Sequence, residues 1–399
     1  IYAEHIATLL ESGNAFHCFC SAERLDEVRK TQMAAKQQPG YDGHCAHLSK
    51  AEVDTKLAAN EDYVIRMRVP ETGNCEFHDM LRGEVSIAWS QIDMQVLMKS
   101  DGLPTYHFAN VVDDHDMKIT SVIRGEEWLS SLPSHVLLYE HFGWTPPKFY
   151  HLPLILKSSG AGKLSKRDAD EQGHPVFAVK WEESAGFKEA GFTSEGLVNY
   201  LALLGWNNSS DKEKYKLFEL IDEFNDSGIN KSGARFDYKK ALWINHLHIK
   251  DFSAEKVLAL SEKAATQLGE KYSSEITEEI IDLIKERLNT ALDIDKELAV
   301  FTGQPKEYDS GVIEKINREI IFDVLNFCKL SEELISNPKA LKEQLMSFGS
   351  EKGISFGNIM KSLRLSLVGN LSGPDLFKII EIIGPEETLH RIESLTNKI

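Results

Sequence analysis

Cysteine and histidine residues near the start of the chain have the types and spacing of a metal site. Cys18 and Cys20 stand two residues apart in an alternating segment, and Cys45 and His47 follow a glycine-bearing turn. On an extended strand, residues i and i+2 face the same side, so both thiols of the first pair point together. Two such pairs supply the four nitrogen and sulfur ligands that tetrahedral zinc prefers. We therefore predict a structural zinc site at Cys18, Cys20, Cys45 and His47.

Alternatives to this ligand set stay open. His44 or Tyr41 competes with His47 for the fourth position, because both belong to the same glycine-bearing stretch. A reading without metal makes Cys18 and Cys45 small buried hydrophobic residues and His47 a surface residue. A catalytic zinc is not expected, because no general base is evident nearby in the sequence.

A second group of polar residues lies between residues 101 and 128. Tyr106 and Asn110 are spaced one helical turn apart. Either Asp113 or Asp114 falls on the same face further along, so a phenol, an amide and a carboxylate would project into one pocket. Arg124 ends a β-branched run, where a guanidinium group can bind a carboxylate through two parallel hydrogen bonds. The alternative is a surface helix with a salt bridge at the end of a strand.

The segment GKLSKR, residues 162–167, carries cationic and hydroxyl side chains after a glycine-bearing loop. A flexible loop that delivers Lys163 and Lys166 suits charge stabilisation of a phosphoryl transition state. A solvated surface turn is the alternative, because short lysine and serine motifs also occur by accident. The segment is not a Walker loop, since no G-x-x-x-x-G-K-[ST] leads into a helix.

The elements that must position these residues follow from the hydrophobic pattern. Residues 1–13 have the spacing of a helix that ends at Gly13, and residues 15–20 and 63–70 resemble strands. From residue 94 to 156 short apolar segments alternate with helical ones, which indicates α/β layers. These segments are residues 95–99, 105–112, 119–123, 134–142 and 150–156.

The last third of the chain has a different pattern. Beyond about residue 245 the strand signals fade, and isoleucine and leucine recur at helical spacing over residues 276–288 and 376–383. Gly384 and Pro385 are typical of a helix stop. We therefore predict an all-helical domain in this part of the chain.

Length and composition limit the classes of protein that remain. At 399 residues the chain is long enough for roughly two to four domains. Five unevenly placed cysteines favour a reducing compartment, here the cytoplasm. No apolar run has the length of a bilayer span, and the first residues have no secretory signal. The net charge of −17 weighs against nonspecific coating of nucleic acid, although a tRNA enzyme needs only local basic patches.

Long motifs throughout the chain resemble bacterial glutamyl-tRNA synthetase, a class I aminoacyl-tRNA synthetase. The central ones are DGLPTYHFANVVDDHDMKITSVIRGEEWL, HVLLYEHFGW, FYHLPLIL and KLSKR. The front of the chain, ESGNAFHCFC with YDGHC, is similar to the zinc-bearing subset of that family. YLALLGW, KSGARFD and GNLSGPDLF extend the resemblance over essentially the whole chain.

The resemblance implies catalytic and ATP-binding roles. KLSKR matches the second signature of class I synthetases, in which Lys166 stabilises the pyrophosphate leaving group of ATP. Lys163 and Ser165 would support that lysine. Glu127 and Trp128 fall where the family brings ATP and the tRNA 3′ end together.

The resemblance also implies substrate contacts. Tyr106, Asn110 and Arg124 match residues placed around the glutamate substrate, with Arg124 pairing with its carboxylate. Arg364 and Leu376 match positions on the helical cage that meets the tRNA anticodon.

The fold implied by the resemblance is an α/β Rossmann-type catalytic domain with a mixed α+β insertion, followed by an all-α anticodon-binding domain. The partial catalytic domain would comprise residues 1–20 and 95–167. Residues 21–94 would be the acceptor-binding insertion with the zinc site. A stem-contact region, residues 168–245, would lead into the anticodon-binding domain, residues 246–399.

The activity implied by the resemblance is ATP-dependent attachment of glutamate to tRNA(Glu) through a glutamyl-adenylate, with release of AMP and diphosphate. The partners are tRNA(Glu), ATP and L-glutamate, with Mg²⁺ accompanying ATP, and we expect a monomer without membrane contact. Charging of tRNA(Gln) in addition stays open. Arg287 is one candidate for that choice.

One part of the family pattern does not occur in the sequence. The first ATP signature, a His-x-Gly-His type motif, belongs on the first strand-to-helix turn, and residues 1–20 match the stretch just before the insertion. We therefore expect roughly 80 residues of a full enzyme to precede Ile1, and we expect the chain as given not to activate glutamate. The alternative is a noncatalytic tRNA-binding derivative of a synthetase. The helical spacing of residues 250–399 opposes two further relatives, a shortened enzyme that glutamylates a tRNA base and glutaminyl-tRNA synthetase.

Overall fold

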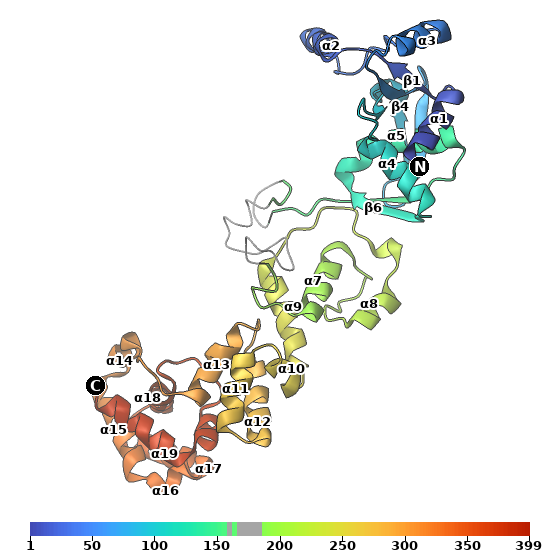
Figure 1. Ribbon diagram of the computed structural model, residues 1–399. Coiled ribbons are helices and arrows are strands. Elements are labelled where there is room, and N and C mark those ends of the chain that lie inside the picture. The colour runs from blue at the N-terminus through green and yellow to red at the C-terminus, as the bar shows by residue number, and fades with distance from the viewer. Residues whose placement is uncertain (158–161, 166–185) are drawn as a thin grey trace. The chain divides into compact units, whose positions relative to one another are not determined.

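The structure is a computed structural model that describes residues 1–157, 162–165 and 186–399 (Figure 1). The chain divides into two compact units. The first unit comprises residues 1–155 and 229–234, and the second comprises residues 156–228 and 235–399. The four-part division expected from the resemblance stays a prediction.

The first unit contains two sheets. An antiparallel sheet has the strand order β1-β2-β5 and a four-stranded sheet has the order β4-β3-β7-β6. In the second sheet β3 and β4 form a hairpin, whereas β3, β7 and β6 run parallel. The strands are β1 (Ala15–Cys18), β2 (Val64–Met67), β3 (Asn74–Asp79), β4 (Gly83–Ala88), β5 (Val96–Met98), β6 (Ser121–Gly125) and β7 (Lys148–Leu152).

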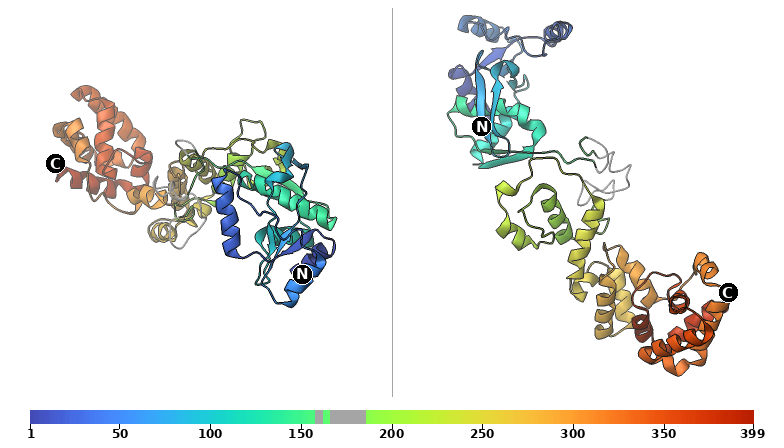
Figure 2. Two further views of the ribbon diagram at one scale, coloured as in Figure 1. Left: turned by 90° about the horizontal axis from the view of Figure 1, so that it is seen from above. Right: turned by 180° about the vertical axis from the view of Figure 1, so that it is seen from behind.

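Helices complete this unit. The helix α5 connects the parallel strands β6 and β7, which makes a β–α–β unit, and it also packs on α4 and β3. Two further helices, α2 and α3, lie at the end of the unit near β1 (Figures 1 and 2). The helices are α1 (Tyr2–Glu11), α2 (Ala22–Ala34), α3 (Lys50–Ala58), α4 (Tyr106–Asp116) and α5 (Leu132–Phe142), with short 3₁₀ turns η1 (Trp89–Gln91) and η2 (Glu126–Ser131).

The core of the first unit explains why these elements form. Apolar residues at helical spacing on α4 (Phe108, Val111 and Val112) are fully buried, as the amphipathic pattern requires. Gly143 ends α5 in a left-handed conformation with φ 66°, which glycine adopts without steric cost. The predicted alternation of strands and helices over residues 94–156 is confirmed within a residue or two at most boundaries.

The second unit has helices and no strand in its described part, residues 156–157, 162–165, 186–228 and 235–399. The helices nearest the first unit in sequence are α7 (Ser194–Gly205), α8 (Leu217–Glu223) and α9 (Tyr238–Lys250), and the 3₁₀ turn η3 (Asp226–Gly228) follows α8. An apolar core that includes Tyr200 and Phe236 is shared by α7 and α9, and α8 packs on α7.

The remaining helices enclose a second core and confirm the predicted helical last third. They are α10 (Ala254–Leu258), α11 (Glu262–Lys271), α12 (Ser274–Lys285), α13 (Asp293–Thr302), α14 (Ser310–Ile316), α15 (Arg318–Leu330), α16 (Glu332–Ile335), α17 (Pro338–Lys352), α18 (Phe356–Val368) and α19 (Leu376–Thr396). The predicted stop at Gly384 is a break in α19, where φ is 80° and ψ is 170°, after which the helix resumes. No helix in the described part of the chain is long and apolar enough to cross a membrane.

Candidate active site and metal centre

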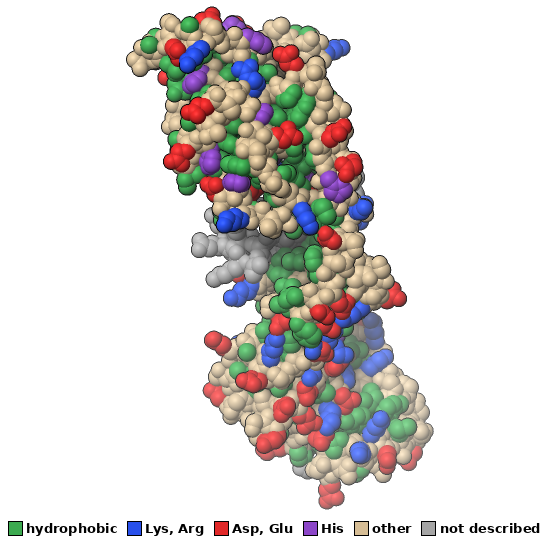
Figure 3. Space-filling model, turned by 90° about the vertical axis from the view of Figure 1, so that its right-hand side faces the viewer, with side chains coloured by type: hydrophobic (Ala, Val, Ile, Leu, Met, Phe, Trp, Pro, Cys, Tyr) green, Lys and Arg blue, Asp and Glu red, His purple; other side chains and the backbone are tan. Residues whose placement is uncertain are grey.

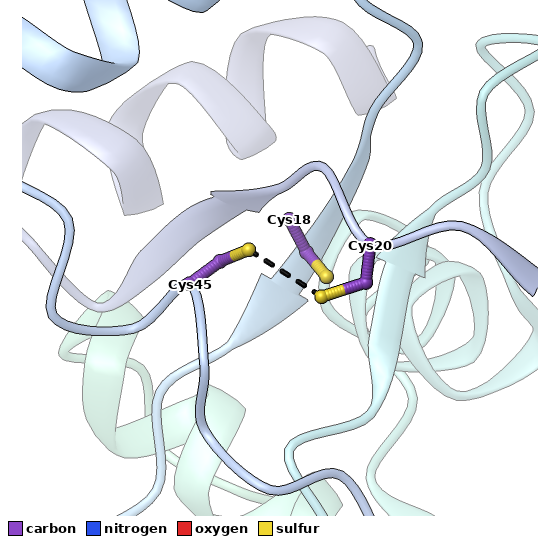
Figure 4. A group of neighbouring side chains, drawn as sticks. All are labelled: Cys18, Cys20 and Cys45. Carbon is purple, nitrogen blue, oxygen red and sulfur yellow. Dashed lines mark hydrogen bonds between the residues drawn. The ribbon is translucent and has the colours of Figure 1, made fainter. Parts of the chain in front are cut away.

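Three cysteine side chains meet at the end of β1 (Figure 4). The sulfur atoms of Cys18, Cys20 and Cys45 all lie within 4.8 Å of one another, and the Sγ atoms of Cys20 and Cys45 are 3.5 Å apart. Cys18 and Cys45 are buried and Cys20 is half-buried. Cys18 is the last residue of β1, Cys20 lies two residues beyond the strand, and the turn that contains Cys45 brings the third thiol to them.

The hydroxyl group of Tyr41 lies among these thiols. It is 3.4 Å from the sulfur of Cys18 and 3.6 Å from that of Cys20, and it accepts a hydrogen bond from the Cys45 backbone N–H. His47 is exposed and is not a member of the cysteine group. His44, the other histidine left open by the sequence, is also exposed, so Tyr41 is the candidate that faces the thiols and the fourth ligand stays a prediction.

The donor set fits zinc. Three thiols at a mutual distance of less than 5 Å can converge on one ion, and the phenol oxygen of Tyr41 can supply a fourth donor atom. Arg66 stacks on the ring of Tyr41, with its guanidinium carbon 4.2 Å from the ring centroid. That stacking fixes the ring whose hydroxyl group faces the sulfur atoms.

The predicted amino-acid pocket begins on α4. Tyr106 is the first residue of this helix and Asn110 follows one turn later, so both project from one face as the spacing predicts. The ring of Tyr106 lies 5.2 Å from that of Trp128 and is 54% exposed, which leaves it accessible to a ligand. Thus α4 and η2 bring two of the predicted residues into contact.

Arg124 enters the same cluster from β6. Its guanidinium carbon is 5.9 Å from the ring centroid of Trp128, and its Nε donates a hydrogen bond of 3.1 Å to His151 Nε2. Its Nη2 atom is buried and has no hydrogen-bond partner among the described residues. Desolvation lowers the pKa of Arg124, and Tyr106 acts in the opposite direction. A buried guanidinium nitrogen without a partner is costly, so this geometry favours an anionic ligand.

The structure separates the two aspartates that the helical spacing left as alternatives. Tyr2 donates a hydrogen bond of 2.7 Å to Asp113, which therefore faces α1. Burial raises the pKa of Asp114, and the charge of Arg124 opposes that shift. Asp114 is therefore the carboxylate on the side of Arg124.

Glu127 and Trp128 both lie in η2, directly after β6. The carboxylate of Glu127 is exposed and folds over Gly125, where a Cβ atom would collide with it. A side chain at position 125 would displace this exposed carboxylate from the end of the strand.

Sequence reasoning missed two residues behind Arg124. His151 and Asp79 are fully buried, and His151 Nδ1 lies 2.7 Å from Asp79 Oδ2. Burial alone would raise the pKa of Asp79, but hydrogen bonds from His151 and from the Arg82 backbone hold it below its usual value. The only signal was the histidine in FYHLPLIL.

The segment with the predicted phosphate-binding residues, of which residues 162–165 are described, belongs to the second unit. Leu164 is buried in the core of α7 and α9, while its neighbours Lys163 and Ser165 are exposed. A β-bridge joins Leu156 to Lys163, so the segment folds back on the chain that leads into it. Lys166 lies outside the described residues.

The predicted tRNA contacts lie on the C-terminal helices. Arg364 is half-buried and donates a hydrogen bond of 2.8 Å to the carbonyl group of Pro374. Arg287 pairs with Glu297 at 2.5 Å and donates to Ser372 on the same loop. Leu376 is 1% exposed, so its side chain belongs to the core and its contact with tRNA stays a prediction.

Beside these residues is a cleft of about 650 Å³. Its lining combines lysine and acidic side chains with the loop of Ser372 and Pro374. Acidic and basic side chains are interspersed over this part of the molecule, and no continuous basic surface appears on the face in Figure 3. Electrostatic contact with nucleic acid on this face would therefore depend on local lysine and arginine groups.

Two protein-family models match the chain. Residues 1–243 match the model described as tRNA synthetases class I (E and Q), catalytic domain. Residues 253–396 match the model of an anticodon binding domain. The two matches together define a class I tRNA synthetase with a catalytic domain and a helical anticodon-binding domain.

Individual relatives identify the family within the class I synthetases. A glutamate–tRNA ligase of Flavobacterium johnsoniae is 41% identical over 98% of this chain and 81% of its own. One from Alkaliphilus metalliredigens is 41% identical over 98% of this chain and 79% of its own. The crystal structure of a glutamate tRNA ligase from Elizabethkingia meningosepticum in complex with its amino acid superposes with a TM-score of 0.88 at 37% identity, covering 99% of this chain and 82% of that one. This chain belongs to the glutamate–tRNA ligase family.

Proposed function

We propose that this protein attaches glutamate to tRNA(Glu) in two steps. In the first, the carboxylate of glutamate attacks the α-phosphorus of ATP, which forms glutamyl-adenylate and releases diphosphate. In the second, a hydroxyl group of the 3′-terminal ribose attacks the acyl carbon, which forms glutamyl-tRNA and releases AMP. Neither step needs a covalent protein nucleophile, so the chain contributes position and charge.

The buried Nη2 atom of Arg124 carries this proposal. It lies in a cluster with Trp128 and is not satisfied by any described residue. A substrate carboxylate would supply the missing acceptor and neutralise a partly desolvated cation. Tyr106 and Asn110 on α4 would orient the remainder of the amino acid.

Other residues have proposed roles in ATP and tRNA binding. Lys166, supported by Lys163 and Ser165, would stabilise the negative charge that develops on the leaving diphosphate. Glu127 and Trp128 would meet ATP and the tRNA 3′ end. Mg²⁺ bound with ATP would neutralise phosphate charge.

The remaining proposals concern the whole molecule. Zinc held by the three cysteines and Tyr41 would fix the insertion, residues 21–94, that binds the tRNA acceptor end. The stem-contact region and the anticodon-binding domain would begin at residues 168 and 246, with Arg364 and Leu376 on the anticodon side. We propose that the protein acts in the cytoplasm as a monomer.

Aminoacylation tests the proposal directly. The protein expressed from its whole reading frame should charge tRNA(Glu) with radiolabelled glutamate and not with glutamine. Arg124→Gln should raise the KM for glutamate by about a hundredfold, because a charged hydrogen bond worth a few kcal/mol is lost. Arg124→Lys keeps the charge and should recover part of the loss. Binding of tRNA without any charging would instead support the noncatalytic alternative.

A further inference from the structure

We propose that Asp79 and His151 are positioning residues that hold Arg124 in the state in which it receives the substrate carboxylate. The inference rests on the proposed function of Arg124, and it assigns a role to two buried residues that do not touch the substrate. The three side chains form one hydrogen-bonded chain across the parallel strands of the larger sheet.

The chain of contacts crosses three neighbouring strands. Asp79 ends β3, His151 lies on β7, and Arg124 is its direct partner in the register of β6. The distances are 2.7 Å from Asp79 Oδ2 to His151 Nδ1 and 3.1 Å from Arg124 Nε to His151 Nε2. Asp79 and His151 are both 0% exposed, so bulk solvent does not reach either side chain.

Asp79 at one end and Arg124 at the other determine the direction of both hydrogen bonds of the His151 ring. The Oδ1 atom of Asp79 accepts from the backbone N–H groups of Leu81 and Arg82, and its Oδ2 atom accepts from the backbone N–H of His151. The carboxylate can therefore only accept from the ring, so Nδ1 of His151 carries a proton. At the other end the Nε–H of Arg124 can only donate, so Nε2 of His151 carries none. The imidazole is neutral with one defined tautomer.

The neutral ring of His151 separates Arg124 from Asp79, and this separation leaves the charge of Arg124 available. A direct ion pair with Asp79 would occupy the guanidinium group and neutralise it. With His151 between them, Nε is held in place by a neutral acceptor, and Nη2 stays buried with no hydrogen-bond partner in the part of the chain that the structure describes. The positive charge is therefore available to a substrate carboxylate at a fixed position, which is the arrangement that pre-organised recognition requires.

Two substitutions at His151 separate positioning from packing. In His151→Gln the side-chain oxygen reaches the place of Nε2 and can still accept from Arg124. In His151→Asn the amide nitrogen reaches the place of Nδ1 and can still donate to Asp79, but nothing remains to accept from Arg124. Both variants are neutral and smaller than histidine, so they are matched controls for each other.

The expected result is a difference in glutamate recognition. His151→Asn should raise the KM for glutamate by about tenfold, the loss expected for one hydrogen bond to a charged group. His151→Gln should stay within about threefold of wild type, and the KM for ATP should stay within about twofold in both. Equal KM values for the two variants, or a parallel rise in the KM for ATP, would overturn the inference.

Asp79→Asn provides a second test through the tautomer. Two backbone N–H groups require the amide oxygen at the Oδ1 position, so the amide NH₂ group faces His151 and the ring must reverse its protonation. The ring Nε2–H would then oppose the Nε–H of Arg124, and the KM for glutamate should rise at least as much as in His151→Asn. Calorimetric binding of glutamate to each variant gives the same comparison without turnover. A wild-type protein that binds glutamate but charges no tRNA would contradict the proposed function and leave this comparison intact.

Discussion

The backbone N–H of Cys45 donates a hydrogen bond of 2.8 Å to the hydroxyl oxygen of Tyr41. This contact holds the phenol oxygen beside the sulfur atoms of Cys18 and Cys20, whereas His47, two residues beyond Cys45, is exposed. Tyr41 is therefore a better candidate than His47 for the fourth ligand of a metal site.

The zinc site can be tested by replacing each of these two candidate ligands in turn. Tyr41→Phe removes the hydroxyl group and should lower zinc affinity by more than about tenfold, whereas His47→Asn should leave the metal content unchanged. Cys18→Ser with Cys20→Ser should abolish binding. Plasma emission analysis of the purified variants measures the zinc per chain. Loss of zinc in His47→Asn with retention in Tyr41→Phe would restore His47 as the ligand.

The anchoring of Leu164, within the segment proposed to bind phosphate, gives a second prediction. Leu164 is 7% exposed and packs with Phe236 in the core of the second unit, between the exposed Lys163 and Ser165. Leu164→Ala should loosen the segment and lower kcat for ATP–pyrophosphate exchange by about tenfold, because small displacements of charge-stabilising groups are costly. Leu203→Ala truncates a leucine of the same cluster outside the segment and should keep kcat within about twofold. Equal loss in both variants would mean that only core stability is affected.

A buried arginine predicts a large effect on stability. Arg391 is 0% exposed and donates to the carbonyl groups of Val300, Leu367 and Gly303. Arg391→Met leaves these acceptors without their donor, and the free energy of unfolding of the helical unit should fall by about 3–5 kcal/mol. Lys378, which is 45% exposed, offers a matched control, because Lys378→Met breaks only surface ion pairs and should cost about 0–1 kcal/mol. Urea denaturation followed by circular dichroism compares the two.

Local patterns predicted the parts of the site that depend on neighbouring residues. The spacing of Tyr106 and Asn110 gave one face of α4, and the i, i+2 pair of cysteines gave two converging thiols. The first relationship is set by the period of the helix, and the second by the short separation of two cysteines at the end of β1. The KLSKR motif likewise identified a segment in which Leu164 is buried and its neighbours Lys163 and Ser165 are exposed.

The relationships that sequence could not supply are long-range. Asp79 and His151 are separated by 72 positions, and nothing local indicates that β3 and β7 are parallel neighbours. The choice between Tyr41 and His47 depends on how one turn folds, which ligand-type spacing does not determine. Leu376 shows a third limit, because a motif position does not reveal whether its side chain faces a ligand or the core.

Burial of His135 gives the last prediction, a dependence of stability on pH. Its side chain is 1% exposed on α5, and desolvation, with a smaller contribution from the charge of Arg124, lowers its pKa from 6.5 to about 3. Below pH 6.5 the unfolded chain binds a proton that the folded protein does not, so stability falls as the pH falls towards 3. His135→Gln should reduce the slope of unfolding free energy against pH by up to about 1.4 kcal/mol per unit between about pH 4.5 and 6. Leu138→Ala, a fully buried change on the same helix, should lower stability by a similar amount at each pH and keep the slope. Chemical denaturation over this range measures both, and a wild-type slope in His135→Gln would show that this imidazole does not take part in the acid destabilisation.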